Sequence, residues 1–196
     1  EDFLHYCKLC EGLVDIFQIR AWTGDMTHAS HYTSPKENPT NLEYAAAFKA
    51  RGIKIACAPV GGYGDPEMME RFLAEGKTDL FAMARQFLAD DHYYEKVTAG
   101  LPAAEIVPCI LCNGYHGHHT CSVNPRLGRK RNLFAETTTP KKVAVIGGGP
   151  GGMMAALTAA RRGHQVTLYE KAPMLGGQLV AASMPDYKWP IGEYLA

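Results

Sequence analysis

The sequence lacks an excess of charge of either sign, and it lacks any long apolar run. Twenty lysine and arginine residues balance twenty aspartate and glutamate residues, so the formal net charge of the 196 residues is zero. A neutral chain has no general attraction to nucleic acid or to an anionic membrane surface. No apolar stretch approaches the roughly 20 residues needed to cross a bilayer, and no signal peptide is recognisable. We therefore expect no nucleic-acid partner and no membrane partner.

Cysteine is not scarce, but its distribution argues against structural disulfides. Three of the six cysteines, Cys109, Cys112 and Cys121, lie within one short segment. This clustering favours a reducing compartment, here the cytoplasm, and ligation of a metal or an iron–sulfur cluster. A C-x2-C pair places two thiolates on one turn, and the third returns from a loop. The spacing also leaves open a structural zinc site completed by a histidine such as His116, and free buried thiols.

The segment 141–171 has the pattern of a dinucleotide-binding unit. An apolar β-branched run precedes Gly147, Gly149 and Gly152, and an alanine-rich helix and a second strand follow, ending at Glu170. Gly147 permits a tight turn, Gly149 lets backbone N–H groups approach a pyrophosphate, and Gly152 lets helix and strand pack closely. Glu170 is placed to accept a hydrogen bond from a ribose 2′-hydroxyl, which favours FAD or NAD over NADP.

The first hundred residues alternate strand and helix patterns. We predict strands at 13–20, 53–60 and 79–84, and helices at 39–51 and 65–75 that stop at Gly52 and Gly76. Asp65 is expected to cap the second of these helices. Strands separated by helices indicate β/α units and a parallel sheet, so the fold class is α/β. Cys7 and Cys10 lie in an earlier helical stretch beside leucines and are interpreted as core thiols.

The chain divides into three segments by composition. Residues 1–100 carry the β/α units, residues 101–138 form a connector with the clustered cysteines and a polar linker, and residues 139–196 begin a dinucleotide-binding domain. The chain starts without methionine and stops before the sheet of such a domain is complete, so we expect an internal fragment of a longer protein. The long loop 21–38 carries His28, His31 and Tyr32, which either line a substrate pocket or are solvated loop residues.

The order of these motifs resembles a known enzyme family. IACAPVGGYGDPE and DLFAMARQFLADD are followed by PCILCN, CSVNPRLG, VAVIGGGPGG and LGGQL. This order is similar to that of the 2,4-dienoyl-CoA reductase, 2-enoate reductase and trimethylamine dehydrogenase group, the multidomain branch of the old yellow enzyme family. The resemblance implies an FMN-binding (β/α)8 TIM barrel, here its last three units, then a [4Fe-4S] segment and the start of a Rossmann-like domain for FAD and NAD(P)H.

The resemblance also implies which residues contact the cofactors. The FMN phosphate would meet the loops after the last two barrel strands, where such barrels commonly bind phosphate. The implied FMN contacts are Gly61, Gly62, Ala84 and Arg85. The implied FAD contacts are Gly147, Gly149, Gly152, Glu170 and Gln178.

Two positions depart from the family pattern. Ala84 stands where the family usually has glycine, which crowds the backbone slightly without blocking a phosphate. Tyr115 and His116 stand where the family usually has its third cysteine, so three thiolates remain. Three outcomes are open: a [4Fe-4S] cluster with His116 or a nearby histidine as the fourth ligand, a labile or [3Fe-4S] cluster, or no cluster. We favour the first.

By resemblance, the intact protein is an NAD(P)H-dependent oxidoreductase that reduces an activated carbon–carbon double bond of an enoate or enoyl-CoA. Electrons would pass from NAD(P)H to FAD, then through the iron–sulfur cluster to FMN and the small unsaturated substrate. The proton donor would lie outside this chain. The alternatives are an amine dehydrogenase of the trimethylamine dehydrogenase type and a non-catalytic zinc-binding or electron-transfer fragment. Homo-oligomerisation is left open.

Overall fold

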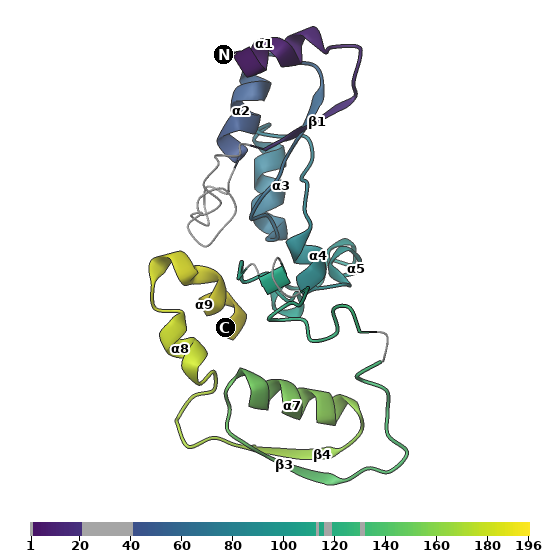
Figure 1. Ribbon diagram of the computed structural model, residues 1–196, viewed down its shortest axis with the longest axis vertical. Coiled ribbons are helices and arrows are strands. Elements are labelled where there is room, and N and C mark those ends of the chain that lie inside the picture. The colour runs from purple at the N-terminus through teal and green to yellow at the C-terminus, as the bar shows by residue number, and fades with distance from the viewer. Residues whose placement is uncertain (1, 21–40, 113, 116–118, 130–131) are drawn as a thin grey trace. The chain divides into compact units, whose positions relative to one another are not determined.

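The computed structural model describes residues 2–20, 41–112, 114–115, 119–129 and 132–196. Contacts divide the chain into two compact units, residues 1–123 (unit 1) and 124–196 (unit 2). Both contain helices and parallel strands (Figure 1), so the predicted α/β class is confirmed. The candidates His28, His31, Tyr32 and His116 lie outside the described residues. Within the part of the chain that is described, no helix is both long and apolar enough to span a membrane.

In both units, strands and helices alternate at first and a run of helices follows. The elements of unit 1 are α1 (Asp2–Leu9), β1 (Ile16–Ile19), α2 (Leu42–Ala50), β2 (Ala56–Pro59), α3 (Pro66–Ala74), α4 (Arg85–Ala89), α5 (Tyr93–Thr98) and η1 (Ala103–Glu105). Those of unit 2 are β3 (Lys142–Ile146), α7 (Pro150–Arg161), β4 (Gln165–Tyr169), α8 (Gln178–Ala182), η2 (Asp186–Lys188) and α9 (Trp189–Leu195).

The first two predicted strands form a parallel pair, and the third is reduced to a bridge. β1 pairs with β2 in parallel from Ile16 opposite Ala56 onward. The strand predicted at 79–84 is reduced to the parallel bridge of Val60 with Ala82. The N–H groups of Leu80 and Ala82 donate to the C=O groups of Cys57 at 3.1 Å and Pro59 at 3.0 Å. Side chains add to these contacts at Cys57, because the Asp79 carboxylate accepts its N–H at 2.9 Å and the Thr78 hydroxyl donates to its C=O at 2.9 Å. The predicted third strand is therefore too long.

Helix ends in unit 1 follow the predicted capping chemistry. Asp65 accepts hydrogen bonds from the N–H groups of Glu67 at 3.0 Å and Met68 at 3.3 Å, with Pro66 in the first turn. At the other end of α3, Gly76 has a φ of 67° and donates its N–H to Leu73. The left-handed conformation at Gly76 ends the helix, as its position after the last periodic residue predicts.

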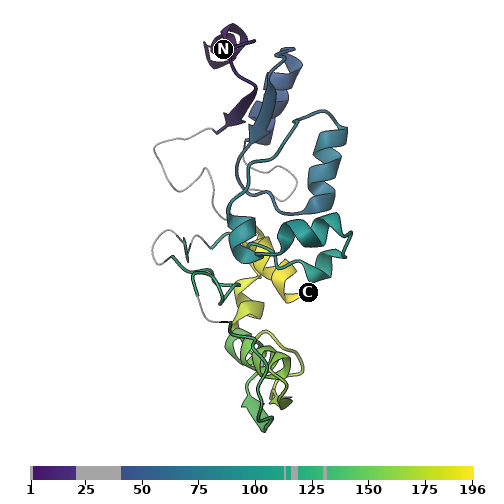
Figure 2. The same ribbon diagram turned by 90° about the vertical axis from the view of Figure 1, so that its right-hand side faces the viewer.

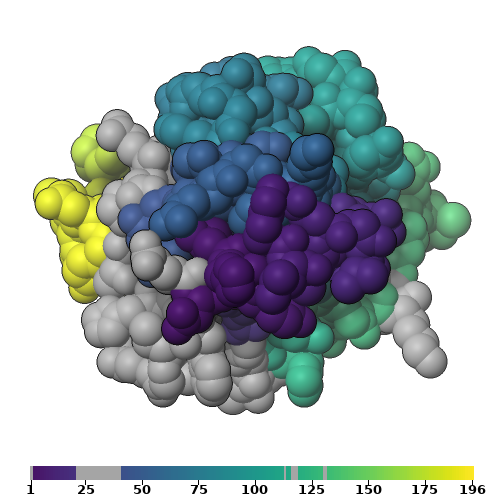
Figure 3. Space-filling view, turned by 90° about the horizontal axis from the view of Figure 1, so that it is seen from above, coloured from purple at the N-terminus to yellow at the C-terminus, as the bar shows by residue number. Residues whose placement is uncertain are grey.

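Two hydrophobic clusters form the core of unit 1. One joins α1, α2 and the strand pair through the buried residues Cys7, Ile19, Ala45, Phe48, Ile53, Ile55 and Cys57, with Leu4, Cys10 and Phe17 packed against them. Figure 3 shows α1 (purple) lying against the blue segment that contains α2. The second joins Leu42, Tyr63, Met68 and Phe72. The interpretation of Cys7 and Cys10 as packing thiols is confirmed.

Unit 2 begins with a strand–helix–strand motif. β3 and β4 are parallel, with Lys142 opposite Gln165 and Ile146 opposite Tyr169. α7 runs along one side of this pair (Figures 1 and 2). Side chains alternate along each strand, and Ile146 and Tyr169 are 80% and 56% exposed. The predicted strand–helix–strand order is confirmed.

The tract before β3 has its own contacts within unit 2, although its composition is typical of a linker. The Phe134 ring lies between the guanidinium groups of Arg126 and Arg161, at 5.4 and 5.0 Å from its centroid. The N–H of Thr137 donates to the C=O of Arg162 at 2.9 Å. Cation–π and backbone contacts thus attach this tract to the C-terminal end of α7.

Candidate functional site

The glycine turn after β3 has the geometry expected of a pyrophosphate-binding loop. Gly147 has a φ of 102°, which favours glycine, and its N–H donates to the C=O of Tyr169 at 2.7 Å. A Cβ on Gly152 would fall 1.8 Å from the Gly147 oxygen, so only glycine fits there. A Cβ on Gly149 or Gly151 would meet no atom within 4 Å. The N-terminus of the 12-residue helix α7 is therefore open to an anion.

Glu170 braces this turn as well as ending β4. One carboxylate oxygen accepts the N–H of Gly148 at 2.5 Å, and the other accepts the N–H of Ala172 at 2.8 Å. The hydrogen bond from Ala172, followed by that from Gly148, lowers the pKa of Glu170. Each carboxylate oxygen has a second lone pair, so a ribose hydroxyl can still donate to it. The bracing contacts were not predicted from the sequence.

The glycines of the LGGQL motif fold over the glycine turn. Gly176 donates its N–H to the C=O of Gly148 at 2.8 Å. A Cβ on Gly177 would lie 3.0 Å from the Cα of Gly149, and Gly177 has a φ of 53°. Gln178 follows as the first residue of α8. Gly148, Gly176 and Gly177 are not among the site residues predicted from the sequence, although a second glycine pair after a dinucleotide motif is a signal of close backbone approach.

In unit 1, a second glycine turn and Arg85 each follow one of two segments that a parallel bridge joins. Gly61 and Gly62 have φ values of 121° and 74°, both in the left-handed region. Because Val60 and Ala82 form a parallel bridge, the two loops that follow them begin side by side. Ala84 has a φ of −132° and is exposed, so the departure from glycine strains nothing.

The half-buried Arg85 supplies the positive charge at this turn. Burial lowers the pKa of Arg85, and the nearby thiols of Cys109 and Cys112 oppose that shift. An arginine remains a cation at neutral pH under such a shift. The guanidinium thus lies within electrostatic reach of the first two clustered cysteines. A left-handed glycine turn and a cation are groups of the kind that bind a phosphate such as that of FMN.

In the cysteine segment, the sulfur of Cys109 accepts a hydrogen bond from the backbone. Leu111 is buried with a φ of 52°, uncommon for a residue with a side chain. Its N–H hydrogen-bonds to Cys109, which opposes the effect of burial, and burial raises the pKa of the Cys109 thiol. Cys112 and Cys121 also raise it, so both lie within electrostatic reach of Cys109.

The thiols do not form a complete metal site among the described residues. No three Cys, His, Asp or Glu side chains there converge on one ion. Cys112 instead lies 3.2 Å from the Ser122 hydroxyl. Three thiols on one segment are the type of donor that holds an iron–sulfur cluster or, with a fourth ligand, zinc.

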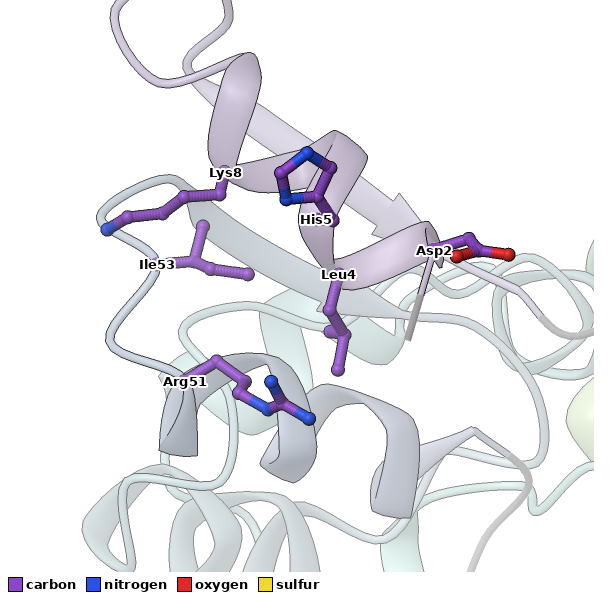
Figure 4. A pocket seen from close by; sticks show the side chains of 6 residues that line it. All are labelled: Asp2, Leu4, His5, Lys8, Arg51 and Ile53. Carbon is purple, nitrogen blue, oxygen red and sulfur yellow. The ribbon is translucent and has the colours of Figure 1, made fainter.

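One hollow in unit 1 is lined by none of the predicted site residues. Its volume is about 460 Å³, and it lies between α1 and the end of α2. The side chains around it come from Asp2, Leu4, His5, Lys8, Arg51 and Ile53 (Figure 4). Most of these side chains are polar and exposed, and none of them belongs to either glycine turn.

Comparison with known families identifies two flavoprotein regions. Residues 12–104 match the NADH:flavin oxidoreductase / NADH oxidase family, and residues 142–191 match the FAD dependent oxidoreductase family. The two matches contain the two glycine turns. The chain thus has the domains of a flavin-dependent oxidoreductase. It contains an NADH:flavin oxidoreductase region followed by an FAD dependent oxidoreductase region, which confirms the predicted resemblance.

Individual relatives support this assignment. The chain is 42% identical to the NADH oxidase of Thermoanaerobacter brockii over 71% of this chain and 23% of that protein. It is 34% identical to the cinnamate reductase of Clostridium sporogenes over 84% of this chain and 26% of that protein. The structure of a 2-naphthoyl-CoA reductase complex matches with a TM-score of 0.86 and 31% identity, over 99% of this chain and 31% of that one. The chain thus spans about a quarter of the curated relatives' length.

Proposed function

We propose that the protein to which this chain belongs is an NAD(P)H-dependent flavin and iron–sulfur oxidoreductase that reduces an activated carbon–carbon double bond. The observation that carries the proposal is the place of Arg85, which lies within electrostatic reach of the thiols of Cys109 and Cys112. Arg85 also comes three residues after Ala82, the bridge partner of Val60, and the glycine turn at Gly61 and Gly62 follows Val60 directly. One cation would therefore serve a phosphate-type turn and a cysteine segment in the same unit. A dinucleotide turn follows in the chain.

The proposal assigns one cofactor to each site. Gly61, Gly62, Ala84 and Arg85 would hold FMN at the end of a (β/α)8 barrel. Gly147, Gly149, Gly152, Glu170 and Gln178 would hold FAD in a Rossmann-like domain. Cys109, Cys112 and Cys121 would hold a [4Fe-4S] cluster, with His116 as the proposed fourth ligand. When bound, these groups supply the hydride and electron-transfer chemistry, while the chain's own residues position them.

The proposed substrate class rests on the similar proteins. Cinnamate and 2-naphthoyl-CoA are a carboxylic acid and a thioester whose carbonyl carbon is conjugated to unsaturated carbon. A carbonyl group in conjugation with a double bond makes the β-carbon accept hydride. We therefore propose an enoate or enoyl-CoA-type substrate for this protein. Oxidation of an amine on the same scaffold, a cytoplasmic location and homo-oligomerisation stay predictions from the sequence.

The test uses the full-length protein, purified without oxygen. We expect one FMN, one FAD and about four iron and four sulfide per chain, and NADH or NADPH oxidation that depends on cinnamate or an enoyl-CoA. An amine, offered with an artificial electron acceptor, serves as the comparison substrate. Turnover of the amine alone would support the dehydrogenase alternative. One zinc per chain with no iron would refute the cluster and support the zinc-binding alternative.

A further inference from the structure

The side chain of Gln86 lies between three backbone segments of unit 1. It is 2% exposed. Its Oε1 accepts the N–H of Cys109 at 2.9 Å, and its Nε2 donates to the C=O of Val107 at 2.9 Å. A Cβ added to Gly64 would fall 2.7 Å from the same Oε1. One buried amide therefore contacts the glycine turn and is hydrogen-bonded to the segment that enters the first clustered cysteine.

Asp90 holds the same segment from the other end of α4. Its buried carboxylate accepts the N–H of Val107 at 2.9 Å through Oδ2, and the Lys96 ammonium donates to that oxygen at 2.7 Å. The Asp90 N–H in turn donates to the C=O of Gln86 at 2.9 Å. Both backbone groups of Val107 thus have partners on this short helix end. We call Gln86 and Asp90 the α4 clamp.

The side chains of the clamp supply hydrogen bonds that secondary structure supplies elsewhere in the chain. Residues 106–112 belong to no helix or strand, and Pro108 has no N–H to donate. Buried backbone groups require partners, and in this segment side chains of α4 supply them. The position of Cys109 relative to the glycine turn is therefore set by two side-chain contacts of Gln86 and not by a backbone ladder.

We propose that Gln86 is a positioning residue that fixes the Cys109 thiol relative to the glycine turn at 61–64 and to Arg85. The inference rests on the proposed function, since it takes Cys109 as a cluster ligand. Partners that orient a metal ligand typically affect metal binding by about 10- to 100-fold. A Gln86 that only filled the core would affect thermal stability and leave the spectrum of the cluster unchanged.

The experiment compares three variants of the full-length holoenzyme. Gln86→Met keeps the size of the side chain and removes both hydrogen bonds. Gln86→Glu keeps the acceptor for the Cys109 N–H and removes the donor. Thr78→Val is the matched control, because Thr78 is equally buried and bonds the C=O groups of Cys57 and Leu80, away from the cysteine segment.

The readouts are hydrogen exchange of the peptide that covers 107–109, iron per FMN, and the electron paramagnetic resonance spectrum of the reduced protein. For Gln86→Met we expect exchange at the Cys109 amide and loss of iron to increase by at least about tenfold, with an altered spectrum and FMN retained. Gln86→Glu should restore most of the protection at Cys109. Thr78→Val should match the wild type in all three readouts.

Wild-type exchange and a wild-type spectrum in Gln86→Met would overturn the inference. If Gln86→Met does not fold, Gln86→Glu is compared with the shorter Gln86→Asn, because only the glutamate side chain can reach the Cys109 N–H. Equal spectra and equal exchange in these two variants would also overturn the inference. A wild-type protein without iron would refute the proposed function. The exchange comparison would still show whether Gln86 holds Cys109.

Discussion

The two glycine turns of this chain are built in different ways. The turn in unit 2 is held by residues of one strand–helix–strand motif and its following loop, with hydrogen bonds from Gly147 to Tyr169 and from Gly148 to Glu170. The turn in unit 1 follows a segment that a single parallel bridge joins to the segment before Arg85, and Gln86 connects this turn to the cysteine segment. The first site is nearly complete within its own motif, whereas the second depends on segments brought together by packing.

This difference affects how each site should respond to substitution. A site made within one motif depends on whether each residue fits its backbone position, so a single methyl group can abolish it. A site made from distant segments depends on side-chain contacts, each of which contributes a modest net amount. We therefore expect all-or-none effects in unit 2 and graded effects in unit 1.

The largest effect is expected from Gly152→Ala. A Cβ there would fall 1.8 Å from the Gly147 oxygen, so the turn must open. We expect FAD content of the full-length protein to fall at least about tenfold with FMN retained, because overpacking costs about 1–3 kcal/mol or more. Released flavins, separated and quantified after denaturation, measure this. Gly151→Ala is the control, since its methyl group would meet no atom within 4 Å. Normal FAD content in Gly152→Ala would remove the contrast between the sites.

The next effect concerns the cation of unit 1. We expect Arg85→Met to weaken FMN binding by about tenfold, since a hydrogen bond to a charged group is worth about 1.5–3 kcal/mol. Arg85→Lys should retain part of the affinity, because it keeps the charge and loses the planar fork. Titration of the flavin-free protein with FMN measures both. Arg71→Met, at an exposed arginine of α3, should bind FMN normally; equal affinity in Arg85→Met would exclude Arg85 as a contact.

A smaller effect is expected from Asp65→Ala, which tests a motif-local feature inside unit 1. The substitution removes the acceptor for the N–H groups of Glu67 and Met68. Loss of such a cap costs about 1 kcal/mol, so these two amides should exchange about fivefold faster. Asp65→Asn retains an acceptor and should exchange nearly as the wild type does. No change in Asp65→Ala would mean that tertiary packing alone holds the start of α3.

The smallest effect is a pH dependence at Asp90. Burial by itself would raise the pKa of Asp90, but hydrogen bonds from Lys96, Val107 and His92 outweigh it, and the pKa is lowered. A carboxyl group with a lowered pKa stabilises the fold at pH values above its unfolded-state pKa of about 3.9. That stabilisation is lost as the pH falls below this value through the folded-state pKa. The difference in thermal midpoint between wild type and Asp90→Asn should therefore be small and constant near pH 6–7 and shrink below about pH 4. A difference that grows on acidification would contradict the assignment.

The sequence predicted the motif-local parts of both sites. Gly147, Gly149 and Gly152 lie on the turn that their spacing predicts, and Asp65 and Gly76 delimit α3 as expected. The strand predicted at 79–84 is reduced to a bridge, and the Asp79 carboxylate accepts the Cys57 N–H that a longer ladder would use. Apolar pattern alone cannot show such a replacement, since it records burial and not the partner of each N–H.

The contacts that join the sites were not predictable in the same way. Gln86 and Asp90 look like ordinary polar residues of a short helix, and only the structure shows their bonds to Val107 and Cys109, 17 to 23 residues later. Likewise, the contacts of Glu170 with the N–H groups of Gly148 and Ala172 are seen only in the structure. The ribose contact predicted for Glu170 uses the same carboxylate, so residue type alone did not reveal these additional partners.

By itself the sequence determined the order of the two flavoprotein regions, the turn at each glycine and the ends of the helices. These follow from backbone sterics and capping, which act over a few residues. Only the tertiary structure decided that Arg85 lies near the thiols and that Gln86 holds Cys109 beside the glycine turn. Those contacts join segments that are distant in the chain, and the packing of unit 1 determines which of them meet.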